Sequence, residues 1–204
     1  MTEKSVVFES EDLKLEGLLD RAEGDAGVVI THPHPQYGGS MQNNVVESLV
    51  KAYKKAGYTT LRFNFRGMGK SEGRYDEGVG EQADVRGAVA YLKDLGMTSV
   101  DLAGYSFGAW VNARAIKDLN EVARMVMVSP PVNFMDFSFL QYTPKIQLII
   151  AGSRDDIAPP DMIQKMLPQW NKDSAFHIIQ GADHFYWDES AKIESIVEGF
   201  LKRS

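Results

Sequence analysis

The sequence predicts an α/β protein built on a mostly parallel, twisted sheet of about eight strands. From Gly27 onward, short apolar or β-branched runs alternate with segments that carry apolar residues at spacings of three and four. Such alternation is typical of a parallel sheet with helices on both faces. The first two apolar runs are separated only by a short turn, which predicts an antiparallel hairpin at the N-terminus.

Each expected strand is a short apolar or β-branched run, and each expected helix is an amphipathic stretch. In chain order, the expected strands are Ser5–Glu9, Leu13–Asp20, Gly27–Thr31, Thr59–Phe63, Ser99–Ala103, Ala123–Val128, Ile146–Ala151 and Ala175–Gln180. The expected helices are Asn43–Ala56, Glu81–Leu95, Phe107–Leu119, Pro160–Trp170 and Glu189–Lys202. One irregular insertion, at about 129–143, separates the sixth and seventh strands and is too short for a full lid domain.

The composition is that of a single globular domain covering residues 1–204. The chain has a net charge of −6, and 44% of its residues are hydrophobic. The negative charge argues against nucleic acid or an anionic membrane as a partner, and no apolar run reaches the ~20 residues of a membrane span. The N-terminus lacks an export signal, so we expect a cytoplasmic location. We also expect a monomer or a homodimer. Because the chain has no cysteine, disulfides and a cysteine nucleophile are excluded.

The pentapeptide GYSFG, residues 104–108, follows an expected strand and precedes an expected helix. In this setting the pattern G-x-S-x-G predicts a sharp turn that exposes a nucleophilic serine, here Ser106. Gly104 and Gly108 would leave room for that turn because they have no side chains. The pentapeptide alone also fits a glycine-flanked serine at a helix N-terminus, so its context must decide.

A serine hydroxyl becomes a nucleophile when a base takes its proton and an acid orients that base. Two later loops supply these groups in the chain order Ser, Asp, His: SRDDIAPP after the seventh strand and GADHFYW after the eighth. We predict that Asp155 is the acid and His184 the base. Asp156 and His177 are the alternatives. Spacing barely separates the two aspartates, whereas His177 lies inside a strand.

The loop after the third strand reads HPHP at residues 32–35. Acyl transfer needs N–H donors aimed at the developing oxyanion, and proline has no N–H. The backbone N–H of His34 is therefore the donor expected from this loop, and that of Phe107 is the second. The two histidines could instead bind a metal, but a third protein ligand is lacking, so we expect neither a metal nor another cofactor.

A glycine-rich loop, FNFRGMGKSEG at residues 63–73, follows the fourth strand. It lacks the first glycine of a phosphate-binding loop. We expect a structural role instead, in which Arg66 is partly buried and pairs with an acid such as Asp84 on the following helix.

Six stretches together resemble the small α/β-hydrolase superfamily proteins of bacteria, a lidless or nearly lidless group. They are HPHPQYGGSMQNNVV, LRFNFRGMGKSEG, GVGEQADVRGAVAYL, LAGYSFGAW, AGSRDDIAPP and GADHF. The resemblance implies an α/β-hydrolase fold with little or no lid, and a Ser-His-Asp hydrolase that acts on small acyl esters without a cofactor. The matching positions are Ser106 for the nucleophile, Asp155 for the acid, His184 for the base, and His34 and Phe107 for the oxyanion donors.

These observations predict a serine hydrolase, and specifically a carboxylesterase acting on small or short-chain acyl esters or thioesters. The same triad would serve a peptidase or amidase, and a non-catalytic binding protein on this fold is a distant alternative. Aromatic residues near the catalytic loops could line a modest apolar pocket for the acyl group, although packing is the alternative for at least half of them. The candidates are Tyr37, Phe134, Phe137 and Phe185.

Overall fold

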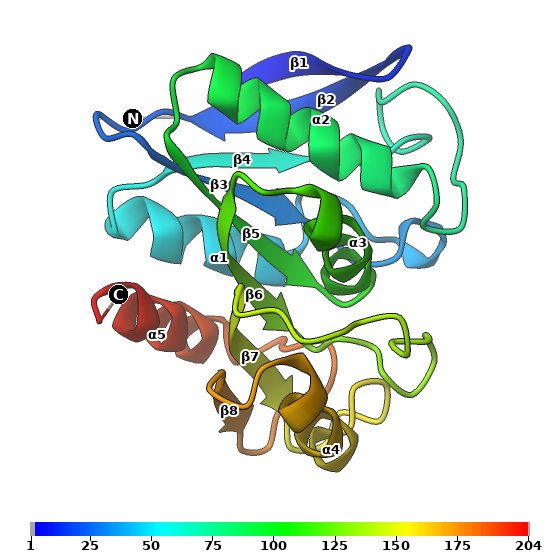
Figure 1. The fold of residues 1–204 in the computed structure, drawn as a ribbon, viewed down its shortest axis with the longest axis vertical. Coiled ribbons are helices and arrows are strands. Elements are labelled where there is room, and N and C mark those ends of the chain that lie inside the picture. Colours follow the sequence, from blue (N-terminus) through cyan, green and yellow to red (C-terminus); the bar gives the residue numbers. More distant parts are fainter. Residues whose placement is uncertain (1–2, 204) are drawn as a thin grey trace.

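The computed structural model describes residues 3–203, which are built around one eight-stranded sheet (Figure 1). The strands are β1 (Lys4–Ser10), β2 (Leu13–Asp20), β3 (Ala26–Thr31), β4 (Thr59–Phe63), β5 (Ser99–Tyr105), β6 (Val122–Val128), β7 (Ile146–Gly152) and β8 (Ala175–Ile179). Their order in the sheet is β1-β2-β4-β3-β5-β6-β7-β8. β2 pairs antiparallel with both β1 and β4, and the other neighbours are parallel, which confirms the predicted fold class.

Five α-helices in this part of the chain cover the two faces of the sheet (Figure 1). They are α1 (Asn44–Lys55), α2 (Glu81–Asp94), α3 (Phe107–Ala115), α4 (Pro160–Trp170) and α5 (Ser190–Leu201). α1 and α5 pack together over one apolar cluster, whereas α2, α3 and α4 cover the cluster on the opposite face. Within residues 3–203, no helix is both long and apolar enough to cross a membrane.

The third helix is shorter than predicted. α3 ends at Ala115 and continues as the 3-10 helix η2 (Ile116–Asp118) before the chain turns at Leu119 into β6. A tighter last turn is common at helix ends, where carbonyl groups lack partners within the helix. The remaining predicted strands and helices match the observed ones to within two residues at either end.

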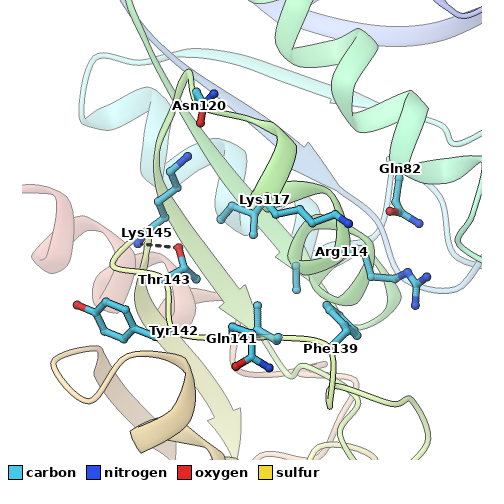
Figure 2. Close-up of a pocket in the computed structure, with 12 residues that line it drawn as sticks. Gln82, Arg114, Lys117, Asn120, Phe139, Gln141, Tyr142, Thr143 and Lys145 are labelled. Carbon is cyan, nitrogen blue, oxygen red and sulfur yellow. Dashed lines mark hydrogen bonds between the residues drawn. The ribbon is translucent and has the colours of Figure 1, made fainter.

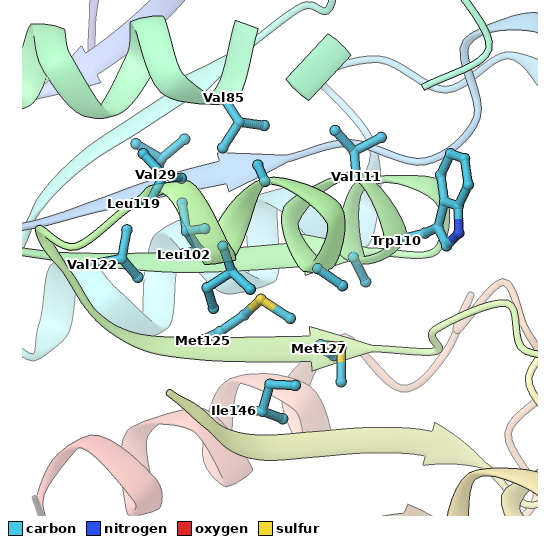
Figure 3. Close-up of a cluster of buried hydrophobic side chains, with 14 of the residues drawn as sticks. Val29, Val85, Leu102, Trp110, Val111, Leu119, Val122, Met125, Met127 and Ile146 are labelled. Atoms are coloured by element: carbon cyan, nitrogen blue, oxygen red, sulfur yellow. The ribbon is translucent and has the colours of Figure 1, made fainter. Parts of the chain in front are cut away.

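Apolar side chains fill the space between the sheet and α3 (Figure 3). Val29, Leu102 and Met127 come from β3, β5 and β6, and they join Val85 of α2 and Val111 of α3 in one cluster. All five side chains are fully buried. Since burying a side chain of this size contributes ~1.5–3 kcal/mol, this cluster fixes the strands whose ends carry the site described below.

The irregular insertion between β6 and β7 is fastened to the helices on one side of the sheet. Trp110 Nε1 donates to the Asp136 carbonyl at 2.8 Å, and Gln169 Nε2 donates to the Leu140 carbonyl at 3.1 Å. These bonds join the insertion to α3 and α4, so the insertion packs against the helices on this face of the sheet.

The strand order reverses at β3, which lies between β4 and β5. In open α/β sheets, such a reversal leaves a crevice at the carboxyl ends of the strands. Thr31 at the end of β3 is in register with Gly104 of β5. The HPHP loop and the GYSFG turn therefore begin side by side.

Candidate active site

The GYSFG turn holds Ser106 in a strained conformation between β5 and α3. Its backbone angles are φ 54° and ψ −119°, a conformation that costs a non-glycine residue about 1–3 kcal/mol. A methyl group at Gly108 would lie 2.6 Å from the Thr31 carbonyl oxygen, and one at Gly104 would lie 2.6 Å from the Ala109 nitrogen. Both glycines are therefore needed for the close approach of the turn to its neighbours, as the sequence pattern indicates.

His184 connects Ser106 with Asp155. Its Nε2 lies 2.9 Å from Ser106 Oγ, and its Nδ1 lies 2.9 Å from each carboxylate oxygen of Asp155. Since an ionised carboxylate only accepts, Nδ1 carries the proton and Nε2 is left to accept from the serine hydroxyl. Ser106 and His184 are each 7% exposed. The structure thus brings together the three residues that the sequence predicts, in one continuous hydrogen-bond chain.

The Asp155 carboxylate is buried and surrounded by hydrogen-bond donors. Ser129 Oγ donates to Oδ2 at 2.6 Å, and the Ile157 and Ala158 N–H groups donate to Oδ1 at 3.0 and 2.7 Å. Burial raises the pKa of Asp155, but the hydrogen bond and charge of His184 and the other donors outweigh it and bring the pKa below its ordinary value. Asp155 is therefore ionised at neutral pH and able to orient the imidazole.

The two alternative residues lie outside this arrangement. Asp156 is exposed, and its main-chain carbonyl accepts from Asn133 Nδ2 at 3.0 Å. His177 lies inside β8, where it is in register with Ile150 of the neighbouring strand β7.

Behind Asp155, two further hydroxyl groups extend the hydrogen-bond chain. Ser129 gives its one hydroxyl proton to Asp155, so the Tyr186 hydroxyl, 2.6 Å from Ser129 Oγ, must donate to it. Burial raises the pKa of Tyr186 far above its ordinary value, which keeps this hydroxyl protonated. A second buried tyrosine, Tyr105, donates to the His184 carbonyl at 2.6 Å. No spacing pattern in the sequence marks these three residues, so their contacts appear only in the folded structure.

Both ring nitrogens of His32 are engaged inside the protein. Nε2 accepts from the Phe65 N–H at 3.1 Å, so Nδ1 carries the proton and donates to the Pro33 carbonyl at 2.6 Å. Burial lowers the pKa of His32 to about 4, and the ring is neutral at physiological pH. His32 therefore has no free nitrogen for a metal. Residues 3–203 contain no cluster of three or more His, Asp or Glu side chains that could hold one.

The imidazole of His34 holds its own loop in place. Nδ1 accepts from the Gln36 N–H at 3.2 Å and so caps the short 3-10 helix η1 (Pro35–Tyr37). Nε2 must then carry the proton, and it lies 3.1 Å from the Tyr75 hydroxyl oxygen. The His34 side chain thus fixes the backbone from which its N–H projects.

The backbone N–H groups of His34 and Phe107 are the predicted oxyanion donors. Within residues 3–203 neither donates to another group. The rings of the two residues are in contact, with centroids 4.9 Å apart. Phe107 is also the first residue of α3, where the helix dipole favours negative charge. Both N–H groups are therefore without a partner in this part of the chain, as an oxyanion donor requires.

Three of the four predicted pocket residues lie at the surface, and two of them contact histidine rings of this site. Tyr37 is 86% exposed and contacts the His34 ring, and Phe185 is 52% exposed and contacts the His184 ring. Phe134 is exposed as well.

Phe137, the fourth predicted pocket residue, lies in the core and not at the surface. Its ring is only 3% exposed and packs against Trp170 in the core, with ring centroids 5.2 Å apart. Phe137 therefore packs in the core and anchors the insertion, contrary to the prediction that it lines a pocket. Along an irregular stretch, no periodicity separates a core aromatic from a surface one.

The predicted pairing of Arg66 with Asp84 is confirmed. Arg66 Nε and Nη2 lie 3.0 and 2.8 Å from Asp84 Oδ1, and the Arg66 backbone N–H donates to Oδ2 at 2.9 Å. Ser10 Oγ donates to the same carboxylate at 2.8 Å. The pair joins the loop after β4 to α2, and its hydrogen bonds within residues 3–203 run to Ser10 and Glu11 and not to the three triad candidates.

The fold and the site together define the class of protein: an α/β-hydrolase fold with a serine at the sharp turn after β5. Residues 28–144 match the alpha/beta hydrolase family, and the chain belongs to this family. An uncharacterized protein from Rickettsia prowazekii is 32% identical over 208 residues, which cover 96% of this chain and 87% of that protein.

Several solved structures are similar to this one along nearly the whole chain. An α/β serine hydrolase homologue from Coxiella burnetii is 34% identical, with a TM-score of 0.91 and 98% of each chain covered. A lidless α/β serine hydrolase from Xanthomonas campestris is 28% identical, with a TM-score of 0.91, 100% of this chain and 95% of that one covered. A Pyrococcus furiosus esterase is 25% identical, with a TM-score of 0.80 and coverages of 98% and 92%. The chain is accordingly a hydrolase of this family.

Proposed function

We propose that this hydrolase is a serine carboxylesterase that acts on small or short-chain acyl esters or thioesters. Ser106 is the nucleophile, His184 the general base, and Asp155 the acid that orients it. The observation that carries the proposal is the unbroken hydrogen-bond chain from Asp155 through His184 to Ser106, with each contact at 2.9 Å.

In the first half of the proposed cycle, Ser106 Oγ attacks the acyl carbonyl carbon while His184 Nε2 takes the hydroxyl proton. Asp155 stabilises the imidazolium through its hydrogen bond to Nδ1. The N–H groups of His34 and Phe107 bind the oxyanion, and one such donor contributes about 2.7–4 kcal/mol in other enzymes. His184 then protonates the leaving alcohol or thiol, which departs and leaves an acyl-serine.

In the second half, a water molecule takes the place of the leaving group. His184 Nε2 removes a proton from this water as it attacks the acyl-serine carbonyl. When the second tetrahedral intermediate collapses, His184 returns the proton to Ser106 Oγ and the carboxylic acid is released. The depressed pKa of Asp155 supports this role because the carboxylate stays charged at every step.

Two features support a short acyl chain. The insertion between β6 and β7 is too short for a lid domain and is tied to α3 and α4. The aromatic rings at the site, Tyr37 and Phe185, are exposed and offer apolar contact at the surface. An extended acyl chain would need a long enclosed apolar pocket, whereas a short one can be accommodated between such rings.

The test is a substrate panel of p-nitrophenyl acetate, butyrate and octanoate, an acyl thioester, and an aminoacyl anilide. We expect turnover of the acetate, the butyrate and the thioester, with slower turnover of the octanoate and the anilide. Ser106→Ala should lower kcat/KM by at least about 10³-fold, since the nucleophile is lost. Ser195→Ala, at an exposed serine on α5, is the matched control and should leave kcat/KM unchanged.

The panel also contains the outcomes that would contradict the proposal. Absence of turnover on every substrate would exclude hydrolysis by Ser106. Faster turnover of the anilide than of the esters would favour a peptidase or amidase with the same triad. Equal activity of Ser106→Ala and the wild type would place the nucleophile elsewhere.

A further inference from the structure

A groove of about 450 Å³ lies at the far end of α3 from Ser106 (Figure 2). It is formed by the last turn of α3, by η2 and by the segment 139–145. Ser106 precedes the first residue of α3, whereas Arg114 in the groove lies eight residues later, about 12 Å along the helix axis. Neither the triad nor the predicted oxyanion donors line the groove, so its side chains take no part in the chemistry proposed above.

The groove gathers positive charge on a protein with a net charge of −6. Arg114, Lys117 and Lys145 line it, and none of its described lining residues is acidic. Lys145 Nζ donates to the Leu119 carbonyl at 2.6 Å. Over residues 3–203, none of the three cations has a carboxylate oxygen within 4.0 Å. The three cations thus form no ion pair within 4.0 Å among the described residues, although the charge of Arg114 also acts on the Asp136 carboxylate and helps to lower its pKa. A concave surface lined by such cations is suited to an anion.

Arg114 is held in a fixed position within this groove. Its guanidinium carbon lies 4.9 Å from the Trp110 ring centroid and 5.2 Å from that of Phe139, so two aromatic rings contact the guanidinium. Its Nε is buried and has no hydrogen-bond partner in the described residues. A guanidinium that is preorganised and unpaired loses little freedom on binding an anion, and its planar fork suits phosphate oxygens.

The opposite side of the groove offers a different surface. In Figure 2, Gln82, Arg114 and the ammonium end of Lys117 lie on one side, whereas Tyr142 and Lys145 lie on the other. The Tyr142 ring is 63% exposed and could stack on a planar group. The groove thus combines a cationic end with an accessible aromatic ring.

We propose that this groove binds a phosphate monoester that carries a planar ring, the chemistry of a nucleoside monophosphate. A phosphate monoester carries about −1.5 to −2 charges at neutral pH, which Arg114 and Lys117 together would neutralise. The ring would stack on Tyr142. The groove is a binding site separate from Ser106, and its occupation is independent of ester hydrolysis.

Isothermal titration calorimetry of the full chain with AMP, adenosine and inorganic phosphate tests the proposal. We expect AMP to bind with one site per chain, and adenosine and inorganic phosphate each to bind more weakly. Lys117→Gln should weaken AMP binding by about tenfold or more, because it removes a charged hydrogen-bond donor. Lys172→Gln is the matched control, since it removes the same charge at an exposed lysine outside the groove.

Arg114→Gln should also weaken AMP binding, but it removes a packed side chain, so thermal melting must accompany it. Lys117 is exposed, and its substitution keeps the test valid if Arg114→Gln fails to fold. Failure of the wild-type protein to bind AMP would overturn the proposal, as would equal AMP binding by Lys117→Gln and Lys172→Gln. Adenosine binding as tightly as AMP would refute the phosphate contact, and phosphate binding as tightly as AMP would refute the ring contact.

Discussion

Two buried aspartates, Asp84 and Asp155, are held in opposite ways. Asp84 is fully buried and accepts from the guanidinium of Arg66, a permanent cation. Asp155 is 2% exposed and accepts from neutral donors and from one imidazole, that of His184. Both carboxylates are fully hydrogen-bonded, but only Asp155 faces a group that can gain and lose a proton.

This difference separates a structural carboxylate from one suited to catalysis. The Asp84–Arg66 pair neutralises itself, so it joins two segments of the fold and has no charge left to influence a reaction. The charge of Asp155 is spread over neutral donors and remains available when His184 becomes an imidazolium. Substitutions at the two sites should therefore differ in kind, with activity lost at Asp155 and stability lost at Asp84–Arg66.

Asp155→Asn tests the proposed catalytic role of Asp155 and should cause the largest loss of activity among these substitutions. An amide in place of the carboxylate presents an N–H group to the imidazole and favours the wrong tautomer, so kcat should fall by about 10⁴-fold. Steady-state hydrolysis of p-nitrophenyl acetate measures it. Asp156→Asn, at the exposed neighbouring aspartate, is the control and should retain full activity. A reversed result would exchange the roles of the two residues.

Arg66→Met tests the structural role of the Asp84–Arg66 pair. It leaves the Asp84 charge buried without its cation, and the free energy of unfolding should fall by about 3–5 kcal/mol. Urea denaturation measures this loss, and Arg74→Met at an exposed arginine should change stability by no more than about 0.5 kcal/mol. Full stability of Arg66→Met combined with loss of kcat would mean that Arg66 belongs to the active site.

Tyr186→Phe removes one neutral donor from the hydrogen-bond chain behind Asp155. Ser129 would lose the hydrogen bond that it accepts, and kcat/KM should fall by about tenfold, or ~1.4 kcal/mol. Tyr105→Phe removes a buried hydroxyl that bonds to a main-chain carbonyl, so it should cost similar stability with a smaller loss of activity. Equal losses of kcat/KM in the two variants would show that the Tyr186 hydroxyl acts only through packing.

His34→Ala should have the smallest effect of the four substitutions. The proposed oxyanion donor is the main-chain N–H, which survives the substitution, while the imidazole contacts to Gln36 and Tyr75 are lost. We expect kcat/KM to fall by less than about tenfold. Pro33→Gly should reduce activity more, because it frees the backbone before the donor. A His34→Ala enzyme as inactive as Ser106→Ala would assign the reaction to the imidazole.

The sequence predicts this fold well because its signals are local. The alternation of strands and helices, the hairpin at the N-terminus and the glycines around Ser106 each follow from neighbouring residues. The three triad candidates could be predicted because each lies in the turn or loop that follows a strand, and parallel strands end at one edge of the sheet.

The sequence could not identify residues whose role depends on contacts between distant segments. Ser129 and Tyr186 are 57 positions apart, and neither belongs to a motif. Phe137 lies in an irregular stretch without periodicity, and its burial depends on Trp170 of α4. The cations of the groove at the end of α3 come from two segments of the chain, Arg114 and Lys117 from one and Lys145 from the other, so the position of Lys145 beside them appears only in the folded structure.

We propose that the Asp155–His184 pair activates Ser106, and the rate at which a fluorophosphonate probe labels the protein measures that activation. Intact-mass analysis followed by peptide mapping should find one adduct on the wild-type protein, on Ser106. The adduct should form far more slowly on Asp155→Asn and at the wild-type rate on Asp156→Asn. No adduct on the wild-type protein, an adduct on another residue, or labelling of Asp155→Asn at the wild-type rate would contradict the claim.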